Sequence, residues 1–380
     1  MCFRYFNINY NWVFLFGLMS IMGLSCKKAY EPPALKFGRS SLVVEGIINS
    51  GGDSTIIKLS KTVPVVDGHI AQSAELHAAV SVEDDQNNIL PLTETGNGKY
   101  VSPGLTINNS RQYRLRVKTA DNNEYVSDFV PVQATPPIDS LGYSITGSGL
   151  QVYVNAHDPT NKVQYYRWDY DEAWEFHAYY ESNYILKGND IVPRIESEKL
   201  YYCFGNDVSS DIPLATTTKS TQAVLNQMPI ALVPSSSEKL SMRYSILVRQ
   251  YALTREAYDF YSLLKKNSES LGSIFDPMPS EIQGNMHCTN NPALPVIGFI
   301  SANNVVSKRI FISNSSLPSN WIYVSPYGCT LNPFITADII ATLKADPKAA
   351  YFISAGTLGT PICSDCTLRG NLNAPSFWVY

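Results

Sequence analysis

The chain has 380 residues, of which 44% are hydrophobic and only 16% are charged, against a charged share of about 25% in typical soluble domains. Its 24 tyrosines, 15 phenylalanines and 5 tryptophans are typical of β-rich domains, in which aromatic side chains pack on a pleated surface. A formal net charge of −4 provides no basic field for a polyanion, so the composition excludes nucleic-acid binding.

The N-terminus predicts an export signal over residues 1–25 that ends at a lipidation site. Arg4 precedes an apolar stretch, and Cys26 follows the small residue Ser25. The apolar stretch is shorter than the roughly 20 residues that a bilayer-spanning helix needs. We therefore expect cleavage before Cys26 and acyl chains on its thiol, which would anchor the mature chain to a membrane. An uncleaved anchor and ordinary secretion are the alternatives.

Strand patterns begin after a polar tether that we assign to residues 26–41. The clearest strand is predicted over residues 112–118, where apolar side chains alternate with basic ones, as in a sheet with one wet face. Short apolar runs separated by turn residues surround it. The spacing of these runs predicts an N-terminal β-sandwich of the immunoglobulin or fibronectin type over residues 42–130.

Adjacent prolines in residues 131–138 predict a linker to a second β-rich domain over residues 139–315. One strong helix, residues 254–266, interrupts its strand pattern. Thr254 can cap this helix, and its apolar side chains share one face, so the helix should lie on the second domain's sheet. A cysteine-containing segment over residues 316–380 follows, with a shorter helix predicted at residues 336–344.

An aromatic-rich stretch in the second domain is the candidate recognition surface. Tyr166, Trp168 and Trp174 alternate with acidic residues, a combination that can stack on sugar rings and hydrogen-bond their hydroxyls. Alternating aromatics in a sheet are more often core residues and cross-strand pairs, so packing is the competing interpretation. Exposed side chains at Trp168 and Trp174 would favour ligand binding.

Five cysteines remain after the signal and Cys26. In an oxidising compartment they allow two disulfides and one free thiol, in fifteen arrangements that spacing alone does not separate. Cys363 and Cys366 have the spacing of a redox pair or half a zinc site. No helix pattern follows them and no second close pair exists, so structural disulfides are the favoured interpretation.

Sequence motifs for catalysis are missing. The five histidines lie far apart, and the chain has no HExxH pattern, nucleophile elbow, P-loop or dinucleotide fingerprint. His157 adjoins Asp158, but neighbouring residues in a turn normally point apart. We therefore predict no catalytic residues, no metal site and no cofactor.

Several stretches, taken together, resemble one family. They are LVVEG at residues 42–46, TPPIDSL at 135–141, YYRWDYDEAWEF at 165–176, YSILVRQYALTREAYDFY at 244–261, FDPMPSEIQGN at 275–285, and the closing CSDC and PSFW. In combination they resemble the Bacteroidota lipoproteins of the family called domain of unknown function 4249. The resemblance implies an outer-membrane lipoprotein, of a kind often encoded beside TonB-dependent receptors, and it implies no particular reaction.

The resemblance also marks Cys288 as an extra cysteine and leaves four matching ones as disulfide candidates: Cys203, Cys329, Cys363 and Cys366. We expect a non-enzymatic accessory or ligand-capturing partner of a TonB-dependent receptor, on either face of the outer membrane. A free-standing glycan-binding or adhesive lipoprotein is the second hypothesis. A hydrolase built around a histidine such as His157 is the third.

Overall fold

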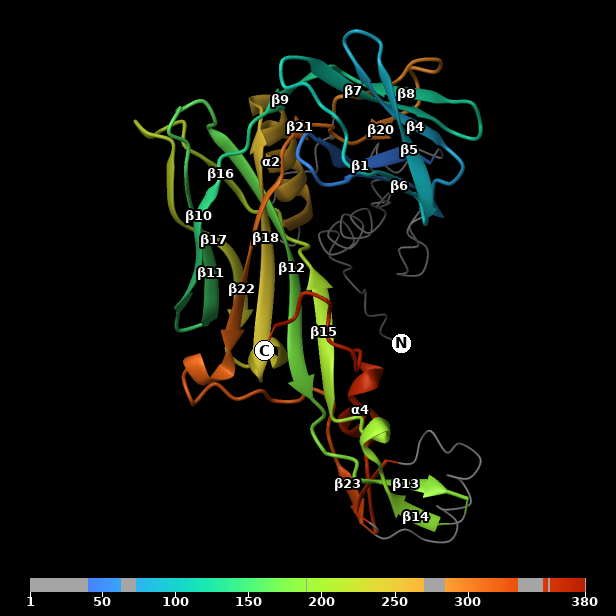
Figure 1. The fold of residues 1–380 in the computed structure, drawn as a ribbon, viewed down its shortest axis with the longest axis vertical. Helices are drawn as coiled ribbons and strands as arrows, with labels where there is room; N and C mark the ends of the chain where they lie inside the picture. Colours follow the sequence, from blue (N-terminus) through green and yellow to red (C-terminus); the bar gives the residue numbers. More distant parts are fainter. Residues whose placement is uncertain are drawn as a thin grey trace, which may run out of the picture. The chain divides into compact units, whose positions relative to one another are not determined.

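The N-terminal strands form a sheet that closes on itself (Figure 1). In the computed structural model, which describes residues 40–62, 73–188, 190–269, 284–333, 351–354 and 356–379, the pairing order β7-β4-β5-β6-β2-β1-β21-β9 returns to β7. Eight strands thus make a barrel-like ring, and the predicted N-terminal sandwich is wrong in its topology. Closure pairs the edges that two separate sheets would leave open.

The sheet contains strands from two distant parts of the chain. They are β1 (Leu42–Asn49), β2 (Thr55–Lys61), β3 (Ser73–Ala74), β4 (Ala79–Asp84), β5 (Ile89–Gly96), β6 (Lys99–Ser102), β7 (Gln112–Lys118), β8 (Glu124–Ser127) and β9 (Val130–Gln133), joined by β19 (Met286–Cys288), β20 (Val296–Ile297) and β21 (Ala302–Asn303). β7 has the alternating burial that the sequence predicted. Ile57, Leu115 and Ile300 are fully buried in the common core.

The return segment, residues 284–303, completes this ring although the sequence placed it in the second domain. β19 pairs with β8, while β20 and β21 pair in parallel with β1, and β21 also pairs with β9. The Asn285 side chain holds the segment together: its amide donates to the Ile300 carbonyl oxygen at 2.9 Å and accepts from the Ile300 N–H at 2.8 Å. Strands of two or three residues are too short to show a periodic pattern, which explains why the sequence did not reveal them.

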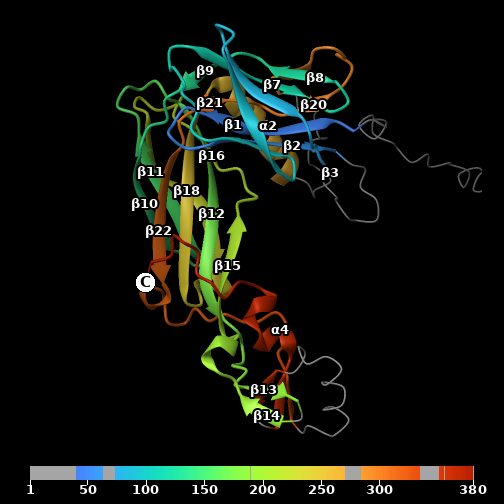
Figure 2. The same cartoon turned by 45° about the vertical axis from the view of Figure 1, so that its right-hand side comes forward.

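Two further sheets share a second core (Figure 2). One contains β10 (Ile138–Ile145), β11 (Gly149–His157) and β17 (Val224–Pro234); the other contains β12 (Tyr165–His177), β15 (Tyr202–Val208), β16 (Leu214–Thr216), β18 (Arg243–Leu253) and β22 (Val306–Ser313). β12 and β18 pair without interruption from Tyr165↔Leu253 to Glu175↔Arg243. Their inward side chains, such as Trp168 and Ile246, meet Val152 of the facing sheet.

The predicted helix is confirmed as α2 (Arg255–Glu269), which contacts β12, β16 and β18. The Thr254 hydroxyl accepts a hydrogen bond from the Ala257 N–H at 3.2 Å, so Thr254 caps the helix as expected. Ala257 and Phe260 pack in one buried cluster with Tyr251. No helix within the described ranges is long and apolar enough to cross a bilayer.

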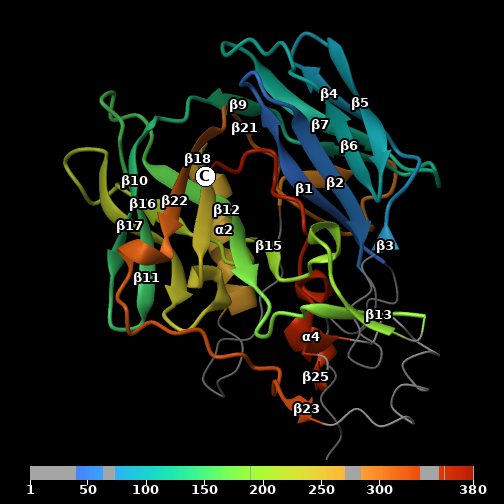
Figure 3. The ribbon, with the colours of Figure 1, turned by 60° about the horizontal axis from the view of Figure 1, so that its bottom comes forward.

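A small sheet near α4 combines two strands from residues 184–193 with three strands from the C-terminal part of the chain (Figure 3). Its core contains Leu186, Phe352 and Leu358. The strands are β13 (Tyr184–Lys187), β14 (Asp190–Pro193), β23 (Leu331–Pro333), β24 (Phe352–Ser354) and β25 (Thr357–Gly359). The short helices among the described residues are η3 (Glu196–Glu198), η4 (Glu238–Leu240), η5 (Asn314–Ser316), α4 (Pro361–Ser364) and η7 (Cys366–Leu368).

Two disulfides pin this C-terminal part: Cys203–Cys366 and Cys329–Cys363. The two cysteines of the Cys-x-x-Cys pair are therefore not bonded to each other. Cys366 is bonded to Cys203 in β15, and Cys363 is bonded to Cys329 in the loop before β23. Cys288 lies buried in β19, outside any disulfide. The predicted signal, Cys26, nearly all of the tether and the helix expected at residues 336–344 lie outside the described residues.

Candidate functional site

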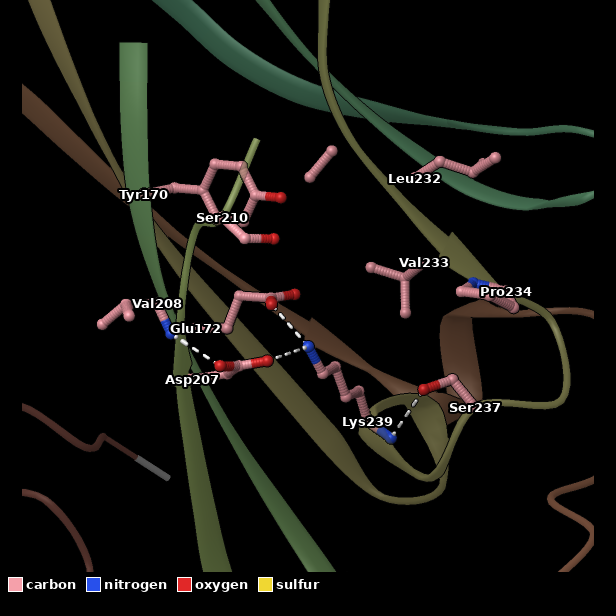
Figure 4. A pocket seen from close by; sticks show the side chains of 11 residues that line it. Tyr170, Glu172, Asp207, Val208, Ser210, Leu232, Val233, Pro234, Ser237 and Lys239 are labelled. Carbon is pink, nitrogen blue, oxygen red and sulfur yellow. Dashed lines mark hydrogen bonds and ion pairs between the residues drawn. The ribbon is translucent and has the colours of Figure 1, made fainter. Parts of the chain in front are cut away.

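A cavity of about 180 Å³ opens between β12 and β15 of one sheet and the end of β17 in the facing sheet (Figure 4). One wall is apolar and the floor is polar. The apolar lining consists of Val208, Ala231, Leu232, Val233 and Pro234; the polar lining consists of Tyr170, Glu172, Asp207, Ser210, Ser237 and Lys239. The site thus sets several charged and hydrogen-bonding groups beside a smaller apolar wall.

Glu172 places a carboxylate at the base of the cavity. It continues the inward-facing series of β12 that begins with Tyr166 and Trp168, and it is only 7% exposed. One of its carboxylate oxygens accepts a hydrogen bond from the Tyr244 hydroxyl at 2.5 Å, and the other contacts Lys239 Nζ at 2.5 Å. A buried carboxylate needs such partners, because an unpaired buried charge is strongly destabilising.

Asp207 lies directly opposite Glu172 in the antiparallel β12–β15 pair. Two like charges in facing positions destabilise a sheet unless a cation lies between them. Lys239 supplies that cation: its Nζ is 3.2 Å from Asp207 Oδ2 and 5.0 Å from the centroid of the Trp174 ring. The Ser237 hydroxyl accepts from the Lys239 N–H at 3.3 Å, which fixes the start of η4 and aims the lysine into the site.

Tyr170 lines the polar floor, while Tyr244 is fully buried outside the lining and reaches the site only through its hydrogen bond to Glu172. Burial, reinforced by the negative charge of Glu172, raises the pKa of Tyr244 well above its ordinary value. Burial also raises the pKa of Tyr170, with Glu172, Asp211 and Asp207 adding to the effect. Both phenols therefore stay protonated at neutral pH and act as hydrogen-bond donors. The arrangement suits binding through hydrogen bonds and ion pairs.

The three aromatic residues predicted for recognition lie beside this cavity and do not line it. Tyr166 and Trp168 are 0% and 1% exposed. The Tyr166 hydroxyl donates to the Val163 carbonyl oxygen at 3.2 Å, and Trp168 Nε1 donates to Gln250 Oε1 at 2.9 Å. The predicted ligand-binding role is wrong for these two, because β12 turns them into the core. Trp174 is partly buried under Lys239.

A different set of aromatic residues reaches the surface at the end of β12. His177 stacks on Tyr201 with ring centroids 4.9 Å apart, and Tyr201 meets Tyr202 edge-on at 4.7 Å. Tyr202 is 54% exposed, and Tyr179 is similarly exposed nearby in the chain. We call His177, Tyr201 and Tyr202 the aromatic edge.

His157 does not pair with its neighbour Asp158. Its Nδ1 lies 2.7 Å from Asp139 Oδ2 on the exposed face of β10 and β11, away from the cavity lining. The Asp158 carboxylate instead accepts from three backbone N–H groups of the following turn, those of Thr160, Lys162 and Val163, at 2.8–2.9 Å. Within the described ranges, no group of three or more His, Cys, Asp or Glu side chains is arranged to hold a metal ion.

A family model described as a domain of unknown function (DUF4249) matches residues 28–309. The chain belongs to the DUF4249 family. The match confirms the resemblance seen in the sequence, and it contains every residue that lines the cavity. A search of curated proteins found no match.

Local sequence patterns revealed only part of the site of this DUF4249 protein. Glu172 was detectable, because a carboxylate stands where the alternation of β12 requires an inward-facing side chain. Asp207 and Lys239 carried no such signal. They reach Glu172 only through the β12–β15 register and the position of η4, neither of which shows in local periodicity.

Proposed function

We propose that this DUF4249 protein is a non-enzymatic, ligand-capturing lipoprotein of the outer membrane that acts beside a TonB-dependent receptor. The observation that carries the proposal is the cavity. Small-molecule sites usually combine apolar walls with a few placed polar groups, and this one sets Glu172, Lys239 and the Tyr170 phenol beside an apolar rim. Val208 and Leu232 on the rim are 65% and 51% exposed. A ligand that covers them would remove apolar surface from water.

The polar groups of the cavity favour capture over turnover. The Glu172 carboxylate is held by Tyr244 and Lys239, so it is already neutralised. The raised pKa values of Tyr170 and Tyr244 keep both phenols from acting as bases near neutral pH. These groups can orient a ligand without activating a nucleophile.

The expected lipid on Cys26 supplies the second part of the proposal. A tethered binding protein raises the local concentration of its ligand beside a transporter without needing tight intrinsic affinity. The apolar run before Cys26 and the polar residues after it support such an anchor.

A pull-down from gently solubilised outer membranes tests this function. The tagged protein should recover one TonB-dependent receptor at near-equal amounts, identified by mass spectrometry. Cys26→Ala is the matched control, and it should neither remain in the membrane fraction nor recover the receptor. If the lipidated protein stays in the membrane and recovers no receptor, the accessory role is wrong.

Glycan binding is a second candidate, favoured by the aromatic edge. The exposed ring of Tyr202, held edge-on against the partly buried Tyr201, can pack against a sugar ring. On a glycan array, Tyr202→Ala should abolish retention. Phe129→Ala, which alters an exposed ring elsewhere, should not. Equal retention by both variants would remove this candidate.

A further inference from the structure

We infer that the cavity takes a small primary ammonium ligand, an organic cation with N–H donors on a short apolar body, and that Lys239 occupies the ammonium position until the ligand arrives. This inference rests on the proposed ligand-capturing function and names the ligand class of the same site. It is carried by Glu172 and Asp207, which face each other across β12 and β15 and share one cation, Lys239 Nζ.

The charges that line the cavity favour a cation. Glu172 and Asp207 contribute two negative charges and Lys239 contributes one positive charge. Asp211 adds a further carboxylate at the Tyr170 phenol. An anionic ligand would meet a net negative site, whereas an ammonium group would be attracted by it.

The hydrogen bonds specify which kind of cation fits. Lys239 Nζ donates to Glu172 Oε2 at 2.5 Å and to Asp207 Oδ2 at 3.2 Å. A ligand ammonium in the same place could make both charge-assisted bonds, which are stronger than neutral ones. A quaternary ammonium has no N–H group and could make neither. A neutral ligand would leave the two carboxylates without their cation if it displaced Lys239.

Lys239 is suited to being displaced. Its side chain is 23% exposed, while that of Glu172 is only 7% exposed, so the cation and not the carboxylate has access to solvent. A lysine ammonium on its flexible four-carbon stem is strongly hydrated and can turn outward. The buried Glu172 carboxylate therefore stays in place as the acceptor, and the Lys239 ammonium can be exchanged for that of a ligand.

The walls define the body of the ligand. Leu232, Val233 and Pro234 line one side of the cavity and Val208 lines the other (Figure 4). A volume of about 180 Å³ accommodates a short aliphatic chain rather than a large ring system. The ligand class is therefore a short primary alkylammonium.

Calorimetric titration of the full chain in detergent tests this inference, with n-butylammonium as the probe and 1-butanol, butyrate and tetramethylammonium as matched compounds. We expect n-butylammonium to bind at least about tenfold more tightly than each of the others, since only it can make both charge-assisted bonds. Equal or tighter binding of 1-butanol or butyrate overturns the ligand class.

Variants at the rim supply the second measurement. Asp207→Asn should weaken n-butylammonium binding about tenfold, because Asp207 is half-exposed and its loss removes one charged acceptor. The control is Asp128→Asn, which alters an exposed carboxylate that follows β8 and pairs with His287 of β19, and which should leave binding unchanged. An unchanged affinity in Asp207→Asn contradicts the inference.

Lys239→Met gives the sharpest outcome. Without the resident ammonium, n-butylammonium should bind at least about tenfold more tightly and should raise Tm far more than 1-butanol does, because it restores the missing cation. Weaker binding than in the natural chain overturns the inference. If Lys239→Met does not fold in the presence of either compound, the affinity of Asp207→Asn for n-butylammonium alone decides the test.

Failure of this inference and failure of the proposed function are distinguishable. Binding of n-butylammonium without recovery of a receptor overturns the accessory role and leaves the ligand class intact. Recovery of a receptor by a chain that does not distinguish n-butylammonium from 1-butanol overturns the ligand class alone.

Discussion

The N-terminal ring and the small C-terminal sheet are stabilised in opposite ways. The ring has a large buried core and paired edges, and it contains no disulfide among its described residues. The small sheet has a core with three buried apolar residues, and two disulfides pin the segment that contains it. Burial and strand closure therefore stabilise the first region, while covalent cross-links compensate for a small core in the second.

Removing a disulfide should produce the largest difference in stability between the two regions. Cys366→Ser opens the Cys203–Cys366 link, which spans 163 residues. Such a link stabilises by roughly 3 to 5 kcal/mol in the chain-entropy model. Limited proteolysis should then cut the small sheet first, while amide exchange in the ring stays slow. Equal loss of protection in both regions would contradict the comparison.

A cavity in the ring's core should destabilise the ring and leave the small sheet unaffected. Leu115 is fully buried in β7, so Leu115→Ala should destabilise the ring by about 2 to 5 kcal/mol. Denaturant unfolding followed by exchange in β1 to β9 measures this change. Leu358→Ala in the small sheet should leave the ring's exchange unaltered.

The return segment offers a smaller test of how the ring is closed. Asn285→Ala removes two buried hydrogen bonds to the backbone of Ile300, so about 2 to 4 kcal/mol of the free energy of unfolding should be lost. Exchange should rise first in β19 to β21. Asn183→Ala, at an exposed position near the small sheet, should change stability by less than about 0.5 kcal/mol.

Acid should produce the smallest effect, confined to the ring. Hydrogen bonds, chiefly from the Asn88 side-chain amide, lower the pKa of Asp84 from 3.8 to about 2. Because the folded pKa is depressed, the stabilisation is present above pH 3.8 and is lost as pH falls towards 2. The Tm difference between the natural chain and Asp84→Asn should therefore shrink over that interval. A difference that stays constant with pH would contradict this account.

Sequence reasoning recovered the elements that carry a strong local pattern. The alternation of β7 and β12, the apolar face of α2 and its Thr254 cap all follow from side-chain periodicity and capping chemistry. Ring closure was not predictable in this way. It depends on the two-residue strand β21, which joins β1 to β9 and whose pairing is set by tertiary contacts.

The site was predictable only in part. The same alternation that made Trp168 a candidate for recognition also turns it inward, so of the two interpretations that the pattern left open, packing is the one that applies to Trp168. The Cys-x-x-Cys spacing suggested a structural role but could not show that its two sulfurs bind different elements. Long-range pairing is a property of the assembled fold.

The return segment has a consequence for how the chain matures. β1 pairs in parallel with residues about 250 positions later, so the contact order of the ring is high and its closure should be slow. During synthesis or export from the N-terminus, β1 and β9 stay open until residues 302–303 are available. A chain truncated before that point would expose two unpaired strand edges to proteases and chaperones. Ring closure thus marks a chain whose synthesis has passed residue 303.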